Sequence, residues 1–431
     1  MQYYSLNRQS PIVSFSQATI KGQAPDKGLY FPSEIPQLSK EFINNLSHYS
    51  KEEIGFQVMK PYVSNEIPDS DLLKIVSETV NFNFPLVKIN DNISSLELFH
   101  GPTLAFKDVG ARFMSRCLGY FNRNNNAKVT VLVATSGDTG GAVANGFLGV
   151  EGVEVVILYP SGKVSPVQEM QLTRLGQNIQ ALEINGSFDD CQAIVKNAFM
   201  DDELTNKVNL TSANSINVAR WLPQQLYYFY AYKQWKETEA PVVCVPSGNF
   251  GNICAGILSF VSGLPAKHFI AACNANDVVP NYIQTGNYQS KEAVATISNA
   301  MDVGNPSNFV RIMQLFANDY PQIKQHLSSY SISDAETART IAEVYKTHAY
   351  MLDPHGAVAY NVLQQYQQSH LNSKGYILET AHPVKFPDVV EKETGVKLAI
   401  PQQVEYLLKQ PKLSVPMDAN YEYLKEWLMK N

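Results

Sequence analysis

The sequence VVCVPSGNFGN, at residues 242–252, joins a short apolar run to a turn that contains two glycines. The apolar run is typical of a buried strand, and the glycines allow the backbone to turn sharply where that strand ends. A helix that starts after such a turn presents free N–H groups, which bind anions. The turn has no acidic residue that would repel an anion. We therefore predict a phosphate cradle at the carboxyl end of this strand.

A second junction of the same kind, VLVATSGDTGGA, occupies residues 131–142. It carries Asp138, whose carboxylate is unfavourable beside a phosphate but can hydrogen-bond to a hydroxyl or an amine. Neither junction contains the Gly-x-Gly-x-x-Gly fingerprint of dinucleotide sites, and the chain has no P-loop of the NTPase kind. For each junction taken alone, a tight turn without a ligand is the alternative interpretation.

Apolar runs alternate with helical patterns from about residue 93 onward. Strands are predicted at residues 129–134, 153–159, 208–210, 242–245, 269–272 and 376–378. A helix is predicted at residues 107–121, where the apolar residues fall on one face. This alternation predicts an α/β fold with parallel sheets that helices cover. Residues 1–90 have Pro and Gly turns, and helical patterns near 38–60 and 68–80 favour a small, mainly helical unit there.

The composition excludes several classes of protein. The 431 residues include 34 Lys plus Arg and 40 Asp plus Glu, for a formal net charge of -6, so we expect no nucleic-acid partner. No apolar stretch reaches the roughly 18 residues of a membrane span, and the N-terminus has no secretory signal pattern, so we expect a cytoplasmic protein without a membrane partner. The five cysteines form no Cys-x-x-Cys pair and indicate buried thiols in a reducing compartment. The sequence has no close cluster of His and Cys residues, so we expect no metal site.

The stretch HGPTLAFKDVG, at residues 100–110, places Lys107 near the start of the predicted helix. The positive end of the helix dipole disfavours an ammonium there and lowers the pKa of the amine. A neutral lysine amine is what Schiff-base chemistry requires. The neighbouring residues are apolar and aromatic, which favours an enclosed side chain over an ordinary surface lysine.

These three stretches, in the order in which they occur along the chain, resemble those of pyridoxal 5′-phosphate (PLP) enzymes of fold type II, and most closely the threonine synthase family. The resemblance extends to YYS at residues 3–5, SNAMDV at 298–303, DPHGAVAY at 353–360 and TAHPVKF at 380–386, so it covers nearly the whole chain. It implies two parallel-type sheet domains and an additional N-terminal domain. The implied division is an N-terminal domain at residues 1–90, a large PLP-binding domain at 91–128 and 226–431, and a small domain at 129–225.

The resemblance also implies an activity, because the family converts O-phospho-L-homoserine and water into L-threonine and phosphate, the last step of threonine biosynthesis. Lys107 would bind PLP covalently and then move protons at the substrate carbons. The other implied contacts to PLP are Gly248, Asn249, Phe250, Gly251 and Asn252 at its phosphate, Thr380 at its pyridine nitrogen and Asp138 at its 3′-oxygen. The implied substrate contacts are Ser136 and Thr139 at the carboxylate, and Lys163, Asn214, Ser215 and Arg220 at the second phosphate.

Other functions are alternatives at this point. A PLP-dependent serine/threonine dehydratase would share Lys107 and the glycine turn but needs no second phosphate site, so the segments around Lys163 and Asn214 argue against it. A catalytically silent homologue that binds PLP or a phosphorylated ligand as a sensor would not need an intact Lys107. A nucleotide-binding α/β protein is the weakest alternative, because the nucleotide fingerprints are missing. We expect a monomer or a homodimer.

Overall fold

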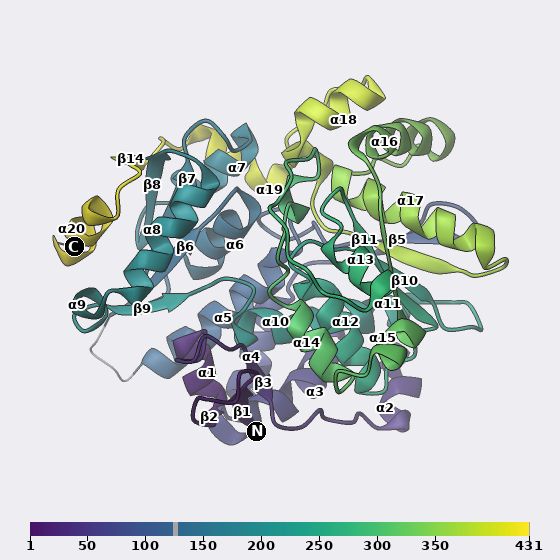
Figure 1. Cartoon of the computed structure of the whole chain (residues 1–431), viewed down its shortest axis with the longest axis horizontal. Helices are drawn as coiled ribbons and strands as arrows, with labels where there is room; N and C mark the ends of the chain where they lie inside the picture. Colours follow the sequence, from purple (N-terminus) through teal and green to yellow (C-terminus); the bar gives the residue numbers. More distant parts are fainter. Residues whose placement is uncertain (124–127, 431) are drawn as a thin grey trace.

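The computed structural model describes residues 1–123 and 128–430. Figure 1 shows two sheets side by side, with the N-terminal helices packed along their lower side. Each of these sheets is built mainly from parallel strands, as the alternation of strands and helices predicts. None of the described helices is both long and apolar enough to cross a membrane.

The N-terminal unit combines a small antiparallel sheet with short helices. Its strands, in the order β2-β1-β3, are β1 (Gln2–Ser5), β2 (Val13–Ser14) and β3 (Tyr30–Pro32). Its helices are α1 (Phe15–Lys21), α2 (Lys40–Asn44), α3 (Lys51–Val63) and α4 (Asp69–Thr79). The patterns at 38–60 and 68–80 match α2, α3 and α4, but no pattern predicts the sheet, because strands of two to four residues are too short to show alternation.

The larger sheet has the order β12-β11-β10-β13-β5-β4. Its strands are β4 (Leu86–Lys88), β5 (Ile93–Glu97), β10 (Val242–Pro246), β11 (His268–Cys273), β12 (Leu327–Ser331) and β13 (Gly375–Glu379). All neighbouring strands are parallel except β4, which is antiparallel to β5. The helices of this unit are α5 (Lys107–Asn122), α11 (Gln225–Gln234), α12 (Gly251–Val261), α13 (Val278–Thr285), α14 (Phe309–Leu315), α15 (Tyr320–His326), α16 (Asp334–His348), α17 (Pro354–Ser369), α18 (Pro387–Thr394) and α19 (Gln402–Glu405).

The smaller sheet is parallel throughout and has the order β14-β8-β7-β6-β9. Its strands are β6 (Val129–Ala134), β7 (Val153–Pro160), β8 (Ile179–Asn185), β9 (Asn209–Ser212) and β14 (Ser414–Asp418). Its helices are α6 (Asp138–Phe147), α7 (Pro166–Thr173), α8 (Phe188–Met200), α9 (Asp202–Thr205) and α20 (Tyr421–Lys430). The short helix α10 (Val218–Trp221) follows β9 and packs against α5 and α12. Short 3-10 helices join elements of the whole chain: η1 (Leu46–His48), η2 (Ser64–Glu66), η3 (Leu222–Gln224), η4 (Asn299–Met301), η5 (Pro383–Lys385) and η6 (Tyr406–Lys409).

The strand β14 corrects the expected division of the chain. It pairs with β8 in register Ser414 to Ala181, so the assignment of residues 226–431 to the large unit alone is wrong for this segment. Its residues are mostly exposed, so no apolar pattern marks it, and its partner β8 is also not among the predicted strands. At the other boundary, β4 lies within the expected N-terminal range of 1–90 but pairs with β5 of the larger sheet.

Most of the predicted elements are confirmed. The strands at 129–134, 153–159, 242–245, 269–272 and 376–378 are β6, β7, β10, β11 and β13, and the helix at 107–121 is α5. The strand expected at 208–210 is displaced toward residue 212 as β9. The strands β5 and β12 are not predicted, because ISSLE and LSSYS contain too many serines to read as apolar runs.

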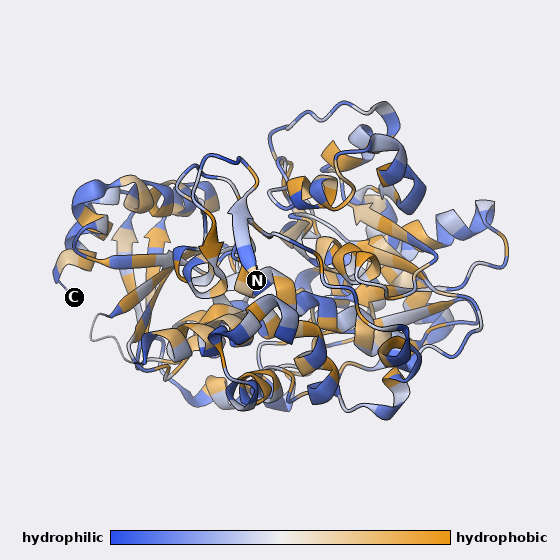
Figure 2. Cartoon of the chain, turned by 90° about the horizontal axis from the view of Figure 1, so that it is seen from below, coloured by the Kyte–Doolittle hydropathy of each residue, from blue (hydrophilic) through white to orange (hydrophobic). Residues whose placement is uncertain are grey.

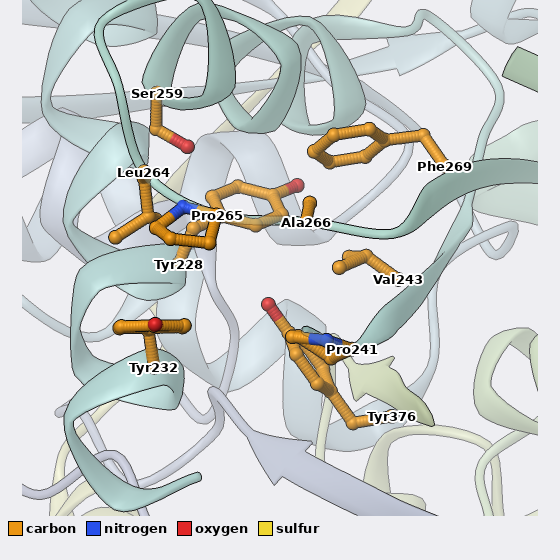
Figure 3. A pocket seen from close by; sticks show the side chains of 10 residues that line it. All are labelled: Tyr228, Tyr232, Pro241, Val243, Ser259, Leu264, Pro265, Ala266, Phe269 and Tyr376. Atoms are coloured by element: carbon orange, nitrogen blue, oxygen red, sulfur yellow. The ribbon is translucent and has the colours of Figure 1, made fainter. Parts of the chain in front are cut away.

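The core lies along both sheets, and the strands of β6 and β10 are buried at every residue. Figure 2 shows hydrophobic colour concentrated on the strands and the inner sides of the helices. All five cysteines are buried and free, as expected. A cavity of about 10 Å³ lies between α11, α12 and β10. Figure 3 shows the side chains that line it, including Tyr228 and Tyr376. A cavity of this size holds at most one water, so it is a packing gap and not a ligand site.

Candidate active site

Lys107 is the first residue of α5, and its side chain reaches the turn between β6 and α6. Its Nζ lies 3.8 Å from Oδ2 of Asp138, and its side chain is 17% exposed. Burial lowers the pKa of Lys107; Asp138 opposes that shift, and Lys385 adds to it. The direction agrees with the one predicted from the helix terminus, but its largest cause is burial. A larger share of neutral amine is therefore present at a given pH than for an exposed lysine.

Asp138 is held as a carboxylate by a second lysine. The Nζ of Lys385, a fully buried residue, lies 2.7 Å from Oδ1 of Asp138. Gln168 donates from Nε2 to the same oxygen at 3.0 Å. Burial alone would raise the pKa of Asp138, but the ammonium groups of Lys385 and Lys107 hold it below its ordinary value. The carboxylate thus has two donors at Oδ1 and the Lys107 amine beside Oδ2.

The turn between β10 and α12 is packed tightly from behind. A Cβ atom at Gly248 would lie 2.5 Å from the Cα of Met301, so only glycine fits there. Phe250 has φ 60°, a left-handed conformation that lets α12 start immediately after the turn. Oδ1 of Asn249 accepts from the backbone N–H of Ser307 at 2.9 Å and from its hydroxyl at 2.6 Å. The turn is therefore fixed before any ligand arrives.

Asn252, the second residue of α12, tests whether this turn suits a phosphate. The hydroxyl of Tyr228 lies 2.8 Å from Oδ1 and 2.9 Å from the backbone carbonyl of Asn252 and donates to this pair of acceptors. Nδ2 of Asn252 is buried and has no hydrogen-bond partner. A buried amide donor without an acceptor is costly, and the first N–H groups of a helix lack intrahelical acceptors as well. The phosphate of PLP would supply acceptors to both, so the residues present fit this cofactor.

Thr380 lies beside the lysine segment. It follows β13, and its carbonyl accepts from the N–H of Phe106 at 2.9 Å. An isolated bridge between Ala105 and Ala381 ties the same two segments together. Thr380 is itself buried. Two predicted cofactor contacts, Lys107 and Thr380, are therefore adjacent although they are far apart in the sequence.

Ser136 and Thr139 are half-buried on the turn that carries Asp138. The hydroxyl of Thr135 accepts from the N–H of Gly137 at 3.0 Å and of Gly140 at 2.9 Å, which shapes this turn. Gly137 has φ 139°, and a Cβ atom there would lie 2.5 Å from Gln168. The structure thus brings Ser136 and Thr139 to the same turn as Asp138.

The residues predicted for the second phosphate are placed less uniformly. Ser215 accepts from Nδ2 of Asn249 at 3.1 Å, which joins its segment to the predicted PLP phosphate turn, and Asn214 is its half-buried neighbour. Arg220 is buried, donates to the carbonyl of Ala213, and has its pKa lowered by burial to about 10. Lys163 is exposed after β7, and no hydrogen bond or ion pair among residues 1–123 and 128–430 joins it to the other predicted site residues.

Sequence reasoning missed Lys385, Gln168 and the pair Ser307 and Asn308. Lys385 stands within the family-like stretch TAHPVKF, and a charged residue in that apolar context was a signal that could have found it. Gln168 is marked only by its position in the capping box of α7, where its side chain returns to Ser165. Ser307 and Asn308 are in an ordinary turn sequence, NPSN, which carries no signal of its own.

Comparison with known proteins places the whole chain. Residues 89–379 match the family described as pyridoxal-phosphate dependent enzyme, residues 2–80 match the threonine synthase N terminus, and residues 356–427 match the threonine synthase C-terminal family. Threonine synthase of Haemophilus influenzae is 44% identical over 433 residues, with both chains fully covered. The crystal structure of Escherichia coli threonine synthase has a TM-score of 0.91 at 41% identity and covers all of both chains. PLP-bound threonine synthase from Brucella melitensis has a TM-score of 0.94 at 35% identity and covers 100% of this chain and 99% of the other.

Proposed function

The chain belongs to the threonine synthase family of PLP-dependent enzymes, and on this basis we propose how its residues convert O-phospho-L-homoserine and water into L-threonine and phosphate. One observation carries the proposal. The amine of Lys107 is buried beside Asp138, and Lys385 balances the charge of that carboxylate. A lysine held in this way is available in its neutral form, as covalent binding of PLP and proton transfer both require.

When bound, PLP supplies an electron-withdrawing ring that stabilises negative charge at the substrate carbons. Lys107 takes and returns the protons at Cα and Cβ of the substrate. Its lowered pKa brings the amine closer to the working pH, where a general base is most effective. The Lys107 side chain is only 17% exposed, which limits exchange of its proton with bulk water.

The remaining cofactor contacts divide between the two sheets. Residues Gly248 to Asn252 hold the phosphate of PLP through the N–H groups at the start of α12 and through Nδ2 of Asn252. The hydroxyl of Thr380 would hydrogen-bond to the pyridine nitrogen of PLP. Asp138 would hold the 3′-oxygen side of the ring, and its ion pair with Lys385 makes a carboxylate acceptable there.

Ser136 and Thr139 bind the substrate carboxylate, since both are half-exposed on the Asp138 turn. Asn214 and Ser215 bind the substrate phosphate, and the contact of Ser215 with Asn249 places this segment beside the cofactor turn. Lys163, exposed after β7, adds a positive charge for that phosphate. Arg220 supports the same segment through the carbonyl of Ala213, and its positive charge contributes to the field at the site.

We further propose a cytoplasmic enzyme that acts as a monomer or a homodimer and binds no nucleic acid. The formal net charge of -6 and the five buried free cysteines support this description. We also propose that the site lies between the smaller and larger sheets, because Lys107 of one unit contacts Asp138 of the other. Movement of the two units toward each other would then exclude water from the reacting groups.

The test is phosphate release from O-phospho-L-homoserine by the purified protein supplied with PLP. We expect phosphate and threonine to appear in equal amounts. Release of ammonia from serine or threonine, without phosphate release from O-phospho-L-homoserine, would favour the dehydratase. A protein that binds PLP but turns over none of these substrates would be the silent homologue.

A further inference from the structure

Arg311 is a buried guanidinium that joins three separate segments. It is 0% exposed and belongs to α14. Nη2 donates to the carbonyl of Tyr30 at 2.9 Å and to that of Ile216 at 2.6 Å, and Nη1 donates to Oδ1 of Asn308 at 2.7 Å. Its Cζ lies 4.3 Å from the centre of the Trp221 ring. No carboxylate of the described residues forms an ion pair with it, so its contacts are to neutral oxygens and to an aromatic face.

The contact with Arg311 fixes the orientation of the Asn308 carboxamide. A guanidinium only donates, so the oxygen of Asn308 must face it and Nδ2 must point the other way. Nδ2 donates to the carbonyl of Asn249 at 3.1 Å and, more weakly, to the hydroxyl of Ser215 at 3.4 Å. The backbone N–H of Asn308 donates to the same Asn249 carbonyl at 3.3 Å.

The carbonyl of Asn249 belongs to the peptide that leads into α12. In a trans peptide the C=O and the following N–H point in opposite directions. Because two donors of Asn308 hold the Asn249 carbonyl on one side, the N–H of Phe250 points to the other side. This peptide could otherwise rotate, since Phe250 is in a left-handed conformation at φ 60° that costs free energy for a residue with a side chain.

We propose that Arg311 and Asn308 are positioning residues that set the direction of the Phe250 N–H in the PLP phosphate turn and couple that turn to the N-terminal unit through Tyr30. Neither residue touches the reacting atoms. The inference rests on the proposed function, because it assumes that this turn holds the phosphate of PLP. It predicts that the relay contributes to the binding of PLP and not to that of pyridoxal, which lacks the phosphate.

The test compares the dissociation constants of PLP and pyridoxal for the apo forms of the wild-type protein and the Asn308→Asp variant. Aspartate keeps an oxygen toward Arg311 but loses the Nδ2 donor. We expect the preference for PLP over pyridoxal to fall at least tenfold, and the ³¹P resonance of bound PLP to shift. Asn308→Leu removes the donor without adding a charge and should lower the same preference. Equal loss of affinity for both ligands, or no loss for either, would overturn the inference.

A matched control and a second variant complete the experiment. Asn178 also donates to two backbone carbonyls, those of Phe147 and Val153, but it lies in the smaller sheet, at the start of β7 and β8, away from the turn after β10. Asn178→Asp should leave the preference for PLP unchanged. Arg311→Lys keeps the charge but lacks the planar fork, so we expect a fall of at least threefold; an unchanged preference contradicts the role of Arg311. If the wild-type protein binds no PLP, the proposed function itself fails, whereas wild-type turnover with unaffected variants refutes only the relay.

Discussion

The turn after β6 and the turn after β10 have the same plan but different chemistry. Each joins a fully buried parallel strand to a helix, and each contains a glycine at which a Cβ atom would lie 2.5 Å from a neighbouring atom, at Gly137 and at Gly248. The first turn carries a carboxylate, Asp138, with a buried lysine 2.7 Å away. The second has no charge and leaves the buried amide of Asn252 without a partner.

The difference shows that the turn geometry alone does not choose a ligand. A strand, a tight glycine turn and a helix N-terminus offer N–H groups in both places. The Asp138 carboxylate adds to the first turn an acceptor for donors and cations, beside the hydroxyls of Ser136 and Thr139, and its ion pair with Lys385 offsets the cost of burying it. The second turn, without such a group, keeps its positive character for an anion. Lys107 contacts the first turn and would carry the cofactor whose phosphate the second one holds.

The largest effect on turnover is expected at Lys107, the amine that contacts the first turn and would carry the cofactor held by the second. Lys107→Ala removes the group that binds PLP and moves protons, so we expect turnover to fall by more than about 10³-fold. The visible absorbance of the lysine-bound cofactor should disappear. Absorbance and phosphate release are measured on the same preparation; a variant with an unchanged visible spectrum would contradict the role of Lys107.

Breaking the charge balance of the first turn should have the next largest effect. Lys385→Met leaves Asp138 buried without its closest cation, and we expect the free energy of unfolding to fall by about 3–5 kcal/mol. Adding Asp138→Asn to this variant should recover part of the loss. Urea denaturation of the single and double variants measures both the loss and the recovery.

Lys412 provides a control, because it pairs with Glu169 and Glu183 at 40% exposure. Lys412→Met should lower the free energy of unfolding by at most about 1 kcal/mol. An equal loss of unfolding free energy in Lys385→Met and Lys412→Met would show that the buried ion pair stabilises the fold no more than the exposed one.

Asp108 is a useful contrast to Asp138. It is also a buried carboxyl, but it has no ion pair among the described residues. Burial raises its pKa from 3.8 to about 6, although the hydroxyl and N–H of Thr103 donate to it. A raised carboxyl pKa stabilises the fold below the unfolded value and loses that contribution as the pH rises through 6. The stability of the wild type relative to Asp108→Asn should therefore fall by roughly 3 kcal/mol between pH 4 and pH 7. Denaturation of both proteins across this range is the measurement, and a difference that does not change with pH would contradict it.

The smallest effect concerns the backbone of the second turn. Gly248→Ala puts a Cβ atom 2.5 Å from the Cα of Met301, so the turn must shift at a cost of about 1–3 kcal/mol. PLP affinity should fall as well, since the N–H groups move with the backbone. At Gly251 the nearest atom is 3.4 Å away, so Gly251→Ala should be tolerated better in thermal unfolding. If Gly251→Ala were the more destabilising variant, the backbone at Met301 would have to shift at little cost, contrary to this prediction.

The sequence predicts the parts of the site that are continuous stretches of chain, but not the contacts between residues that only folding brings together. The two glycine turns and the helix of Lys107 are continuous stretches with recognisable patterns, and the structure has them where they are predicted. Lys385, in contrast, lies far along the chain from Asp138, and only folding brings it within 2.7 Å. Asn308 and Arg311 act on the second turn through hydrogen bonds of their side chains, which no spacing in the sequence encodes. The order of strands, including β14 beside β8, is likewise a property of tertiary packing.

The position of β14 has a consequence for synthesis on the ribosome. The first strands of the smaller sheet emerge early, but its outer strand and the helix α20, whose Leu424 and Leu428 pack with the α8 side of the sheet, are made only after the whole larger unit. Until then the edge of β8 and the apolar face beneath α20 are open to other nascent chains. The smaller sheet therefore stays incomplete until nearly the whole chain has been made.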